Sequence, residues 1–113
     1  MAAERYTIKQ GDYGQAIPAI CKDSAGAAVD ISEAIEVRFH LGAEGSAATV
    51  DAVADNLDDG EVANRGKVSY TFQPGDSATA GDYRAEFEVT WATKRLTFPN
   101  DTYITVKVPD EVA

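Results

Sequence analysis

Cysteine and histidine are nearly missing from this 113-residue sequence, which contains one of each. Cys21 has no partner with which to close a disulfide inside the chain, so the stability of the fold must rest on packing. His40 with one distant cysteine lacks the spaced ligand set of a zinc site. We therefore expect no bound metal and no other cofactor.

Long apolar runs are missing as well, and no stretch of eighteen or more apolar residues occurs. This excludes a transmembrane helix on length grounds, so a membrane is not an expected partner. Residues 1–6 contain no basic stretch followed by an apolar run and thus do not predict a secretory signal. We expect the protein to be made and folded in a cytoplasm.

Basic residues are the minority charge, with ten against nineteen acidic residues and a formal net charge of -9. This balance opposes binding to the phosphate backbone of nucleic acid or to anionic lipid. The hydrophobic fraction of 44% and the charged fraction of 26% are ordinary for a globular protein. At this length, one core and a single domain over residues 1–113 are expected.

Apolar and polar residues alternate with a period of two in four segments, at 35–41, 68–73, 83–91 and 103–108. A strand with one face on a core and one face in water produces this pattern. The predicted inward positions are Ile35, Val37, Phe39 and Leu41, then Val68, Tyr70 and Phe72, then Tyr83, Ala85, Phe87, Val89 and Trp91, and finally Ile104, Val106 and Val108. Pro109 marks the end of the last strand because proline cannot donate to a ladder.

Four further segments have a weaker strand pattern. One lies around Tyr6 and Ile8, and a second at residues 17–21, where Pro18 favours a sheet edge or bulge and an irregular entry into the sheet. Residues 48–56 form a possible extra strand, within an acidic stretch from 51 to 62 that indicates loop or short strand more than helix. Residues 96–98 begin the last strand.

Turn-forming residues separate these strands and complete the fold prediction. They lie at 23–26, 42–46, 58–60, 74–76 and 99–101. Short antiparallel strands spaced by such turns predict an all-β sandwich, because two half-apolar sheets stabilise each other by facing inward. We expect about seven strands.

The residues that open the strand at 83–91 favour an immunoglobulin-like sandwich. Tyr83 follows Gly81 and Asp82 at the start of this strand, where a corner tyrosine sends its hydroxyl back to a backbone group a few residues upstream. Antibody domains carry a cysteine two residues later, but Ala85 occupies that position here. Trp91 also lies at the wrong end of the strand to be their core tryptophan. The prediction is therefore an immunoglobulin-like fold without the antibody disulfide.

Residues able to carry chemistry are few, and each has a structural alternative. His40 falls on the polar face of its strand beside Arg38, and Cys21 is either a small buried hydrophobe or a reactive thiol. An acidic cluster is either a solvated loop or a weak calcium site, although its spacing differs from the twelve-residue calcium loop. Its members are Asp51, Asp55, Asp58, Asp59 and Glu61. No catalytic motif is present, so no enzyme is predicted.

The charged face of the predicted strands has two interpretations. It comprises Arg84, Glu86 and Glu88 on one strand and Glu36 and Arg38 on another. Cross-strand pairing on a wet surface is worth only about 0.2 to 1 kcal/mol per pair. Alternatively, the face is part of a subunit interface, since an acidic module is steered toward a basic patch. The sequence leaves both open.

Three segments, taken in order, resemble a known family. They are Gly66-Lys-Val-Ser-Tyr-Thr-Phe72, Thr79-Ala-Gly-Asp-Tyr-Arg-Ala-Glu-Phe-Glu-Val89 and Leu96-Thr-Phe-Pro-Asn-Asp-Thr-Tyr-Ile-Thr-Val106. Together they resemble the N-terminal immunoglobulin-like domain of phage baseplate upper proteins. Gln10-Gly-Asp12, Lys22-Asp-Ser-Ala-Gly26 and Val29-Asp-Ile31 match the usual opening of that domain. The acidic insert at residues 45–64 follows no pattern of this family.

The resemblance implies a structural protein of a bacteriophage virion, located in the tail or baseplate. Its partners would be other virion proteins or further copies of itself, and the family carries no catalytic residues to transfer. The given sequence ends after the domain, without the stalk or receptor-binding region of larger members, so capsid decoration or the base of a head fibre is the alternative placement. A generic adhesion or carbohydrate-binding sandwich is the other alternative, with Tyr13, Trp91 and Tyr103 as candidate sugar-stacking rings.

Overall fold

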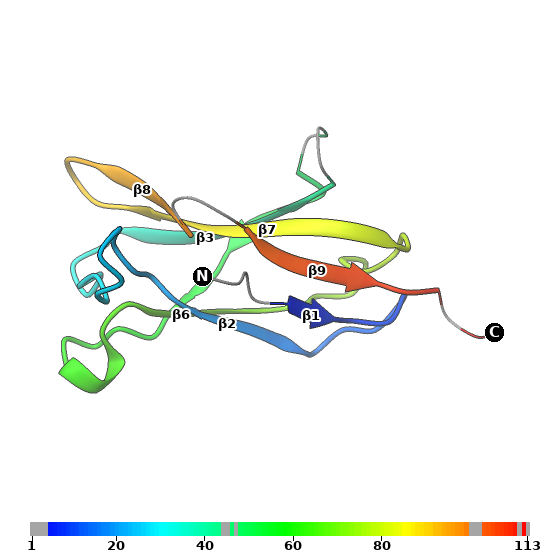
Figure 1. Ribbon diagram of the computed structural model, residues 1–113, viewed down its shortest axis with the longest axis horizontal. Coiled ribbons are helices and arrows are strands. Elements are labelled where there is room, and N and C mark those ends of the chain that lie inside the picture. The colour runs from blue at the N-terminus through cyan, green and yellow to red at the C-terminus, as the bar shows by residue number, and fades with distance from the viewer. Residues whose placement is uncertain (1–4, 44–45, 47, 100–102, 111, 113) are drawn as a thin grey trace.

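The computed structural model describes residues 5–43, 46, 48–99, 103–110 and 112. Nine strands in these residues form two sheets that pack face to face, as the two layers in Figure 1 show. The described residues include no α-helix, and their one helical element is the 3-10 turn η1 (Val62–Asn64). The prediction of an all-β sandwich without a disulfide is therefore confirmed.

The first sheet contains six strands. In order across the sheet they are β1 (Arg5–Thr7), β9 (Ile104–Val108), β7 (Gly81–Thr90), β3 (Glu36–Gly42) and β4 (Val50–Val53), and β8 (Arg95–Phe98) also pairs with β7. β9 pairs with the first part of β7 and β8 with its last part. The two halves of the predicted last strand are therefore separate strands that both lie beside β7. Phe98, the last residue of β8, is joined to Pro99 by a cis peptide bond.

The second sheet contains β2 (Ala16–Ile20), β6 (Lys67–Thr71) and β5 (Asp55–Asn56), in that order. The chain passes between the sheets at Ala54, which is buried and whose N–H donates to the carbonyl oxygen of Val37 at 2.8 Å. Residues 48–56, which the sequence predicts as one possible extra strand, therefore form two short strands in different sheets.

The core lies between the sheets and contains nearly all the predicted inward side chains. The aromatic ring of Phe39 in the first sheet stacks on that of Tyr70 in the second, with centroids 4.4 Å apart. Phe72 and Phe87 meet the Phe39 ring edge-on, at 6.2 and 5.2 Å. Fully burying a side chain of this size stabilises a fold by roughly 1.5 to 3 kcal/mol. This interdigitated cluster thus holds the two layers together.

Three details of the sequence prediction are wrong in whole or in part. Ile35 continues the inward alternation but is 70% exposed, and Trp91, beyond the end of β7, packs against the core but is only half-buried. Alternation fixes the direction of a side chain, whereas burial also needs a facing layer that reaches it. The sandwich is also not wholly antiparallel, since β1 runs parallel to β9, with Tyr6 opposite Val106.

Pro18 lies on an edge strand, as predicted, because β2 is the outer strand of the second sheet. The predicted irregular entry is wrong, since β2 pairs with β6 without a break from Ala16 to Ile20. The hydroxyl of Tyr6, in the first sheet, donates to the carbonyl oxygen of Pro18 at 3.1 Å. This hydrogen bond links the two sheets along one open side of the sandwich.

The corner hydrogen bond predicted for Tyr83 is present. Its hydroxyl donates to the carbonyl oxygen of Thr79, four residues upstream, at 2.6 Å. The ring of Tyr83 is itself part of the core. Tyr83 therefore ties the connection before β7 to the packed interior.

Replacing Tyr83 with phenylalanine keeps the ring and removes this hydrogen bond. We expect the free energy of unfolding to fall by about 1 kcal/mol or more, because the Thr79 carbonyl loses its donor. Urea unfolding of both proteins measures the difference. Tyr13→Phe, at a residue 61% exposed, is the matched control and should leave stability unchanged. Equal stabilities of Tyr83→Phe and the parent protein would contradict this role.

Candidate binding surface

The outer face of the first sheet is a charged surface with no net charge, formed by the side chains that alternate with the core positions. Its outward basic residues are Arg5, Arg38, Arg84, Arg95 and Lys107, and its outward acidic residues are Glu36, Asp51, Asp82, Glu86 and Glu88. Five charges of each sign cancel. The other five basic and fourteen acidic residues of the chain therefore carry its net charge of -9.

Arg38 organises the β3 and β4 side of this face. Its Nε lies 2.7 Å from Oδ1 of Asp51, its Nη2 donates to the carbonyl oxygen of Asp51 at 3.1 Å, and its Nη1 lies 3.5 Å from Oε1 of Glu36. The hydrogen bond from Arg38 holds the pKa of Asp51 below its usual value. Arg38 thus pairs with an acid that the sequence pattern had grouped with the acidic loop.

His40 lies on the polar face of β3, as predicted. Its Nε2 is 3.2 Å from Oδ1 of Asp51 on β4, and Glu86 on β7 is its cross-strand neighbour on the other side. The imidazole is half-buried between two strands that carry carboxylates. It belongs to the sheet face and is far in the fold from buried Cys21 on the second-sheet side.

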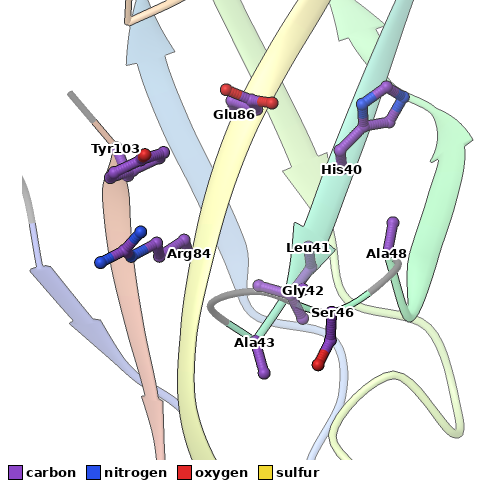
Figure 2. Close-up of a pocket in the computed structure, with 9 residues that line it drawn as sticks. All are labelled: His40, Leu41, Gly42, Ala43, Ser46, Ala48, Arg84, Glu86 and Tyr103. Carbon is purple, nitrogen blue, oxygen red and sulfur yellow. The ribbon is translucent and has the colours of Figure 1, made fainter. Parts of the chain in front are cut away.

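A shallow hollow of about 280 Å³ opens on this face, lined by His40, Leu41, Gly42, Ala43, Ser46, Ala48, Arg84, Glu86 and Tyr103. Figure 2 shows Arg84 and Tyr103 on one side of β7, His40 on the other, and Glu86 on β7 between them. The Arg84 guanidinium lies 4.4 Å from the centroid of the Tyr103 ring. The sequence pattern predicts His40, Arg84 and Glu86 on outward faces and a turn at residues 42–46, but the hollow also depends on the register that places β3 beside β7.

Glu86 differs from the other acids at the centre of this face. Asp51 and Glu36 contact Arg38, and Glu88 lies 4.0 Å from Arg95. In the part of the chain that the structure describes, the Glu86 carboxylate has no hydrogen bond or ion pair. A half-buried carboxylate that lines a hollow in this state has its charge available to pair with a cation.

The acidic cluster is dispersed by the fold. Asp51 belongs to the sheet face, while Asp59 accepts hydrogen bonds from the N–H of Glu61 and from the side-chain amide of Asn64. Among the described residues, no three His, Cys, Asp or Glu side chains come together as a possible metal site. The solvated-loop interpretation is wrong for Asp58, which is buried.

Asp58 is a buried acceptor that joins three segments of backbone. Its Oδ2 accepts from the N–H of Ile31 at 2.9 Å and of Gly66 at 3.0 Å, and its Oδ1 accepts from the N–H of Gly60 at 3.0 Å. Burial alone would raise the pKa of Asp58, but the hydrogen bonds from these three groups lower it below the usual value. The carboxylate therefore stays ionised and stabilises the connections before β3 and β6.

Gly66 occupies a position that no other residue fits. Its φ of +76° lies in the left-handed region, and a Cβ there would approach the carbonyl oxygens of Cys21 at 2.8 Å and Val29 at 3.1 Å. Cys21 is fully buried beside it, in agreement with the hydrophobe interpretation. Burial, with a smaller effect from the Asp58 charge, raises the pKa of the Cys21 thiol to about 12, so it stays protonated at neutral pH.

The three candidate sugar-stacking rings lie apart in the structure. Tyr13 is 61% exposed in the connection between β1 and β2. The Nζ of Lys94 lies 4.6 Å from the Trp91 ring, and Arg84 occupies one face of Tyr103. Two of the three rings thus already hold a cation.

Comparison with known families and with curated proteins found no family model and no relative that matches this chain. In the described residues, no helix has the length and apolar character needed to cross a membrane.

Replacing Asp58 with alanine should lower the free energy of unfolding by at least about 2 kcal/mol, because the buried N–H groups of Ile31 and Gly66 lose their acceptor. Thermal and urea unfolding measure this loss. The control is Asp55→Ala, which removes an exposed carboxylate of β5 and should cost within about 0.5 kcal/mol. Similar costs for the two variants would show that Asp58 is not a structural acceptor.

The lowered pKa of Asp58 also predicts how stability depends on pH. A carboxylate whose folded pKa lies below the unfolded value of about 3.9 stabilises the fold above that value. This contribution is lost as the pH falls through the folded pKa. Between about pH 5 and pH 2, the parent protein should therefore lose more stability than Asp58→Asn, whose side chain does not titrate. Parallel pH profiles would contradict the assignment.

Proposed function

We propose that this chain is a structural protein of a bacteriophage virion that acts by protein–protein assembly and not as an enzyme. The observation that carries the proposal is the ordered resemblance of three segments to the immunoglobulin-like domain of phage baseplate upper proteins. The virion is accordingly the proposed location, after synthesis in the cytoplasm of a bacterial host. Tail or baseplate is the first placement, and capsid decoration or a head-fibre base is the second.

Structural roles of the matching residues support this proposal. Gly66, which opens the first segment, packs against backbone oxygens where a Cβ would clash. Tyr83 in the second segment makes the corner hydrogen bond, and Phe98 in the third is buried opposite Phe87. The three segments correspond to β6, β7 and the β8–β9 pair. The residues that carry the resemblance therefore have roles in maintaining the fold, as expected for a family that is defined by its fold.

The immunoglobulin-like assignment is part of the same proposal. Strand order β9-β7-β3 in one sheet and β2-β6-β5 in the other is compatible with the order of an immunoglobulin sandwich, and β4 adds an edge strand next to β3. The Tyr83 corner supports it as well. An immunoglobulin-like sandwich presents broad sheet faces and short edges, which suit a building block.

A protein–protein role also fits the surface better than sugar binding does. The best-formed feature is a wide polar sheet face with one shallow hollow, while the rings of Tyr103 and Trp91 are each covered on one side by a cation. Arginine and tyrosine side by side are characteristic of the residues that dominate protein interfaces. The sheet face is therefore the proposed assembly surface.

Mass spectrometry of purified phage particles tests the virion role. We expect the chain in constant stoichiometry with the major capsid or tail proteins, and gold-labelled antibodies should place it on the tail or on the head. Genes that flank its own should encode other particle proteins. Absence from washed particles, together with metabolic neighbours, would contradict the proposal.

A further inference from the structure

Charge makes the outer face of the first sheet the favoured contact between two copies of this chain. Each copy carries a net charge of -9, so two copies repel each other through most orientations. The outward residues of this sheet balance five basic against five acidic side chains. Docking through it keeps the remaining acidic surfaces of the two copies apart.

The face is also large enough for a specific dimer. The length of the face is that of β7, whose ten residues span about 33 Å. Its width is that of the five strands β1-β9-β7-β3-β4 side by side, about 24 Å. A standard interface buries about 800 Å² on each partner. Only contact over the whole of this face approaches that size, and the ends of a molecule with cross-section 25 by 24 Å offer less.

The charged side chains on this face that lack a close partner among the described residues include one acid, Glu86, and one base, Arg95. Glu86 lines the hollow and has no ion pair among the described residues. The Arg95 side chain is 68% exposed, and its only ion pair among the described residues is with Glu88, at 4.0 Å. Both therefore have charge available for a partner.

Their positions are related by a simple rotation. Arg95 on β8 is opposite Thr90 on β7, and Thr90 lies four residues from Glu86, about 13 Å along the strand. Glu88 is midway between them. A twofold axis in the plane of the interface, crossing β7 at Glu88, brings Arg95 of each copy over Glu86 of the other. The two Glu88 side chains then meet near the axis, each beside Arg38, its cross-strand neighbour.

We propose that two copies of this chain dimerise through the outer face of the first sheet, with Arg95 of each copy entering the hollow beside Glu86 of the other. The contact is isologous, so a single pairing of residues occurs twice. The hollow presents the carboxylate of Glu86 to this guanidinium, and a carboxylate is an acceptor that suits arginine. Such a dimer gives this chain a partner for assembly.

This inference names one partner for the assembly role proposed above, but the two fail separately. A monomer in solution would overturn the dimer and leave particle mass spectrometry unaffected. Absence from particles would overturn the virion role and leave a measured dimer intact.

Sedimentation velocity over a concentration series, on the full chain, tests the dimer. We expect reversible dimerisation, a dissociation constant at least about tenfold weaker for Glu86→Arg and for Arg95→Glu, and recovery in the double variant that exchanges the two charges. Mixing the two single variants should also restore dimers, because each supplies the charge that the other lacks. Far-ultraviolet circular dichroism verifies that every variant is folded.

Glu61→Arg and Lys22→Glu are the matched controls, because they make the same changes in net charge away from this face and should leave the dissociation constant unchanged. A parent protein that remains monomeric up to about 1 mM overturns the proposal. Equal weakening by the controls, or dimers that neither Glu86→Arg nor Arg95→Glu weakens, overturns it as well.

Discussion

The stack of Phe39 on Tyr70 is the contact on which the two-layer structure depends. The rings come from facing sheets, lie nearly parallel and are surrounded edge-on by Phe72 and Phe87. The Tyr70 hydroxyl then donates to Asp76, whose carboxylate also accepts from the N–H of Gln73. The same tyrosine thus joins the sheets and holds the turn between β6 and β7, which positions the start of the longest strand.

Period-two alternation predicted the central strands because each of their inward residues meets a facing layer. The same rule failed for Ile35, which is 70% exposed, and it held only in part for Trp91, which packs against the core but is half-buried. It also could not separate β4 from β5, because a crossing at Ala54 changes the sheet but hardly changes the pattern of apolar residues. The local pattern therefore specifies the direction in which a side chain points. Whether the facing sheet then buries that side chain is decided only in the assembled sandwich.

The polar features were predictable in part. The sequence pattern placed His40, Glu86 and Arg84 on one outward face, since direction alone decides that. It could not find the pairing of Arg38 with Asp51, which depends on the register between β3 and β4. Nor could it distinguish Asp58 from its acidic neighbours, because only the approach of distant N–H groups makes a buried carboxylate favourable.

The uneven distribution of charge over the surface of the domain connects this fold to its proposed role. Because burying an unpaired charge is costly, an ionised group must lie either in water or in a full set of hydrogen bonds, and Asp58 is the one acidic residue among the described residues that is buried. Acidic excess is therefore spread over the exterior, where it makes contact between copies unfavourable. A balanced sheet face is the exception that the register of β3, β7 and β8 creates. Because that register is fixed by the core on the opposite side of each strand, the packing that stabilises the domain also positions the charges of the proposed assembly surface.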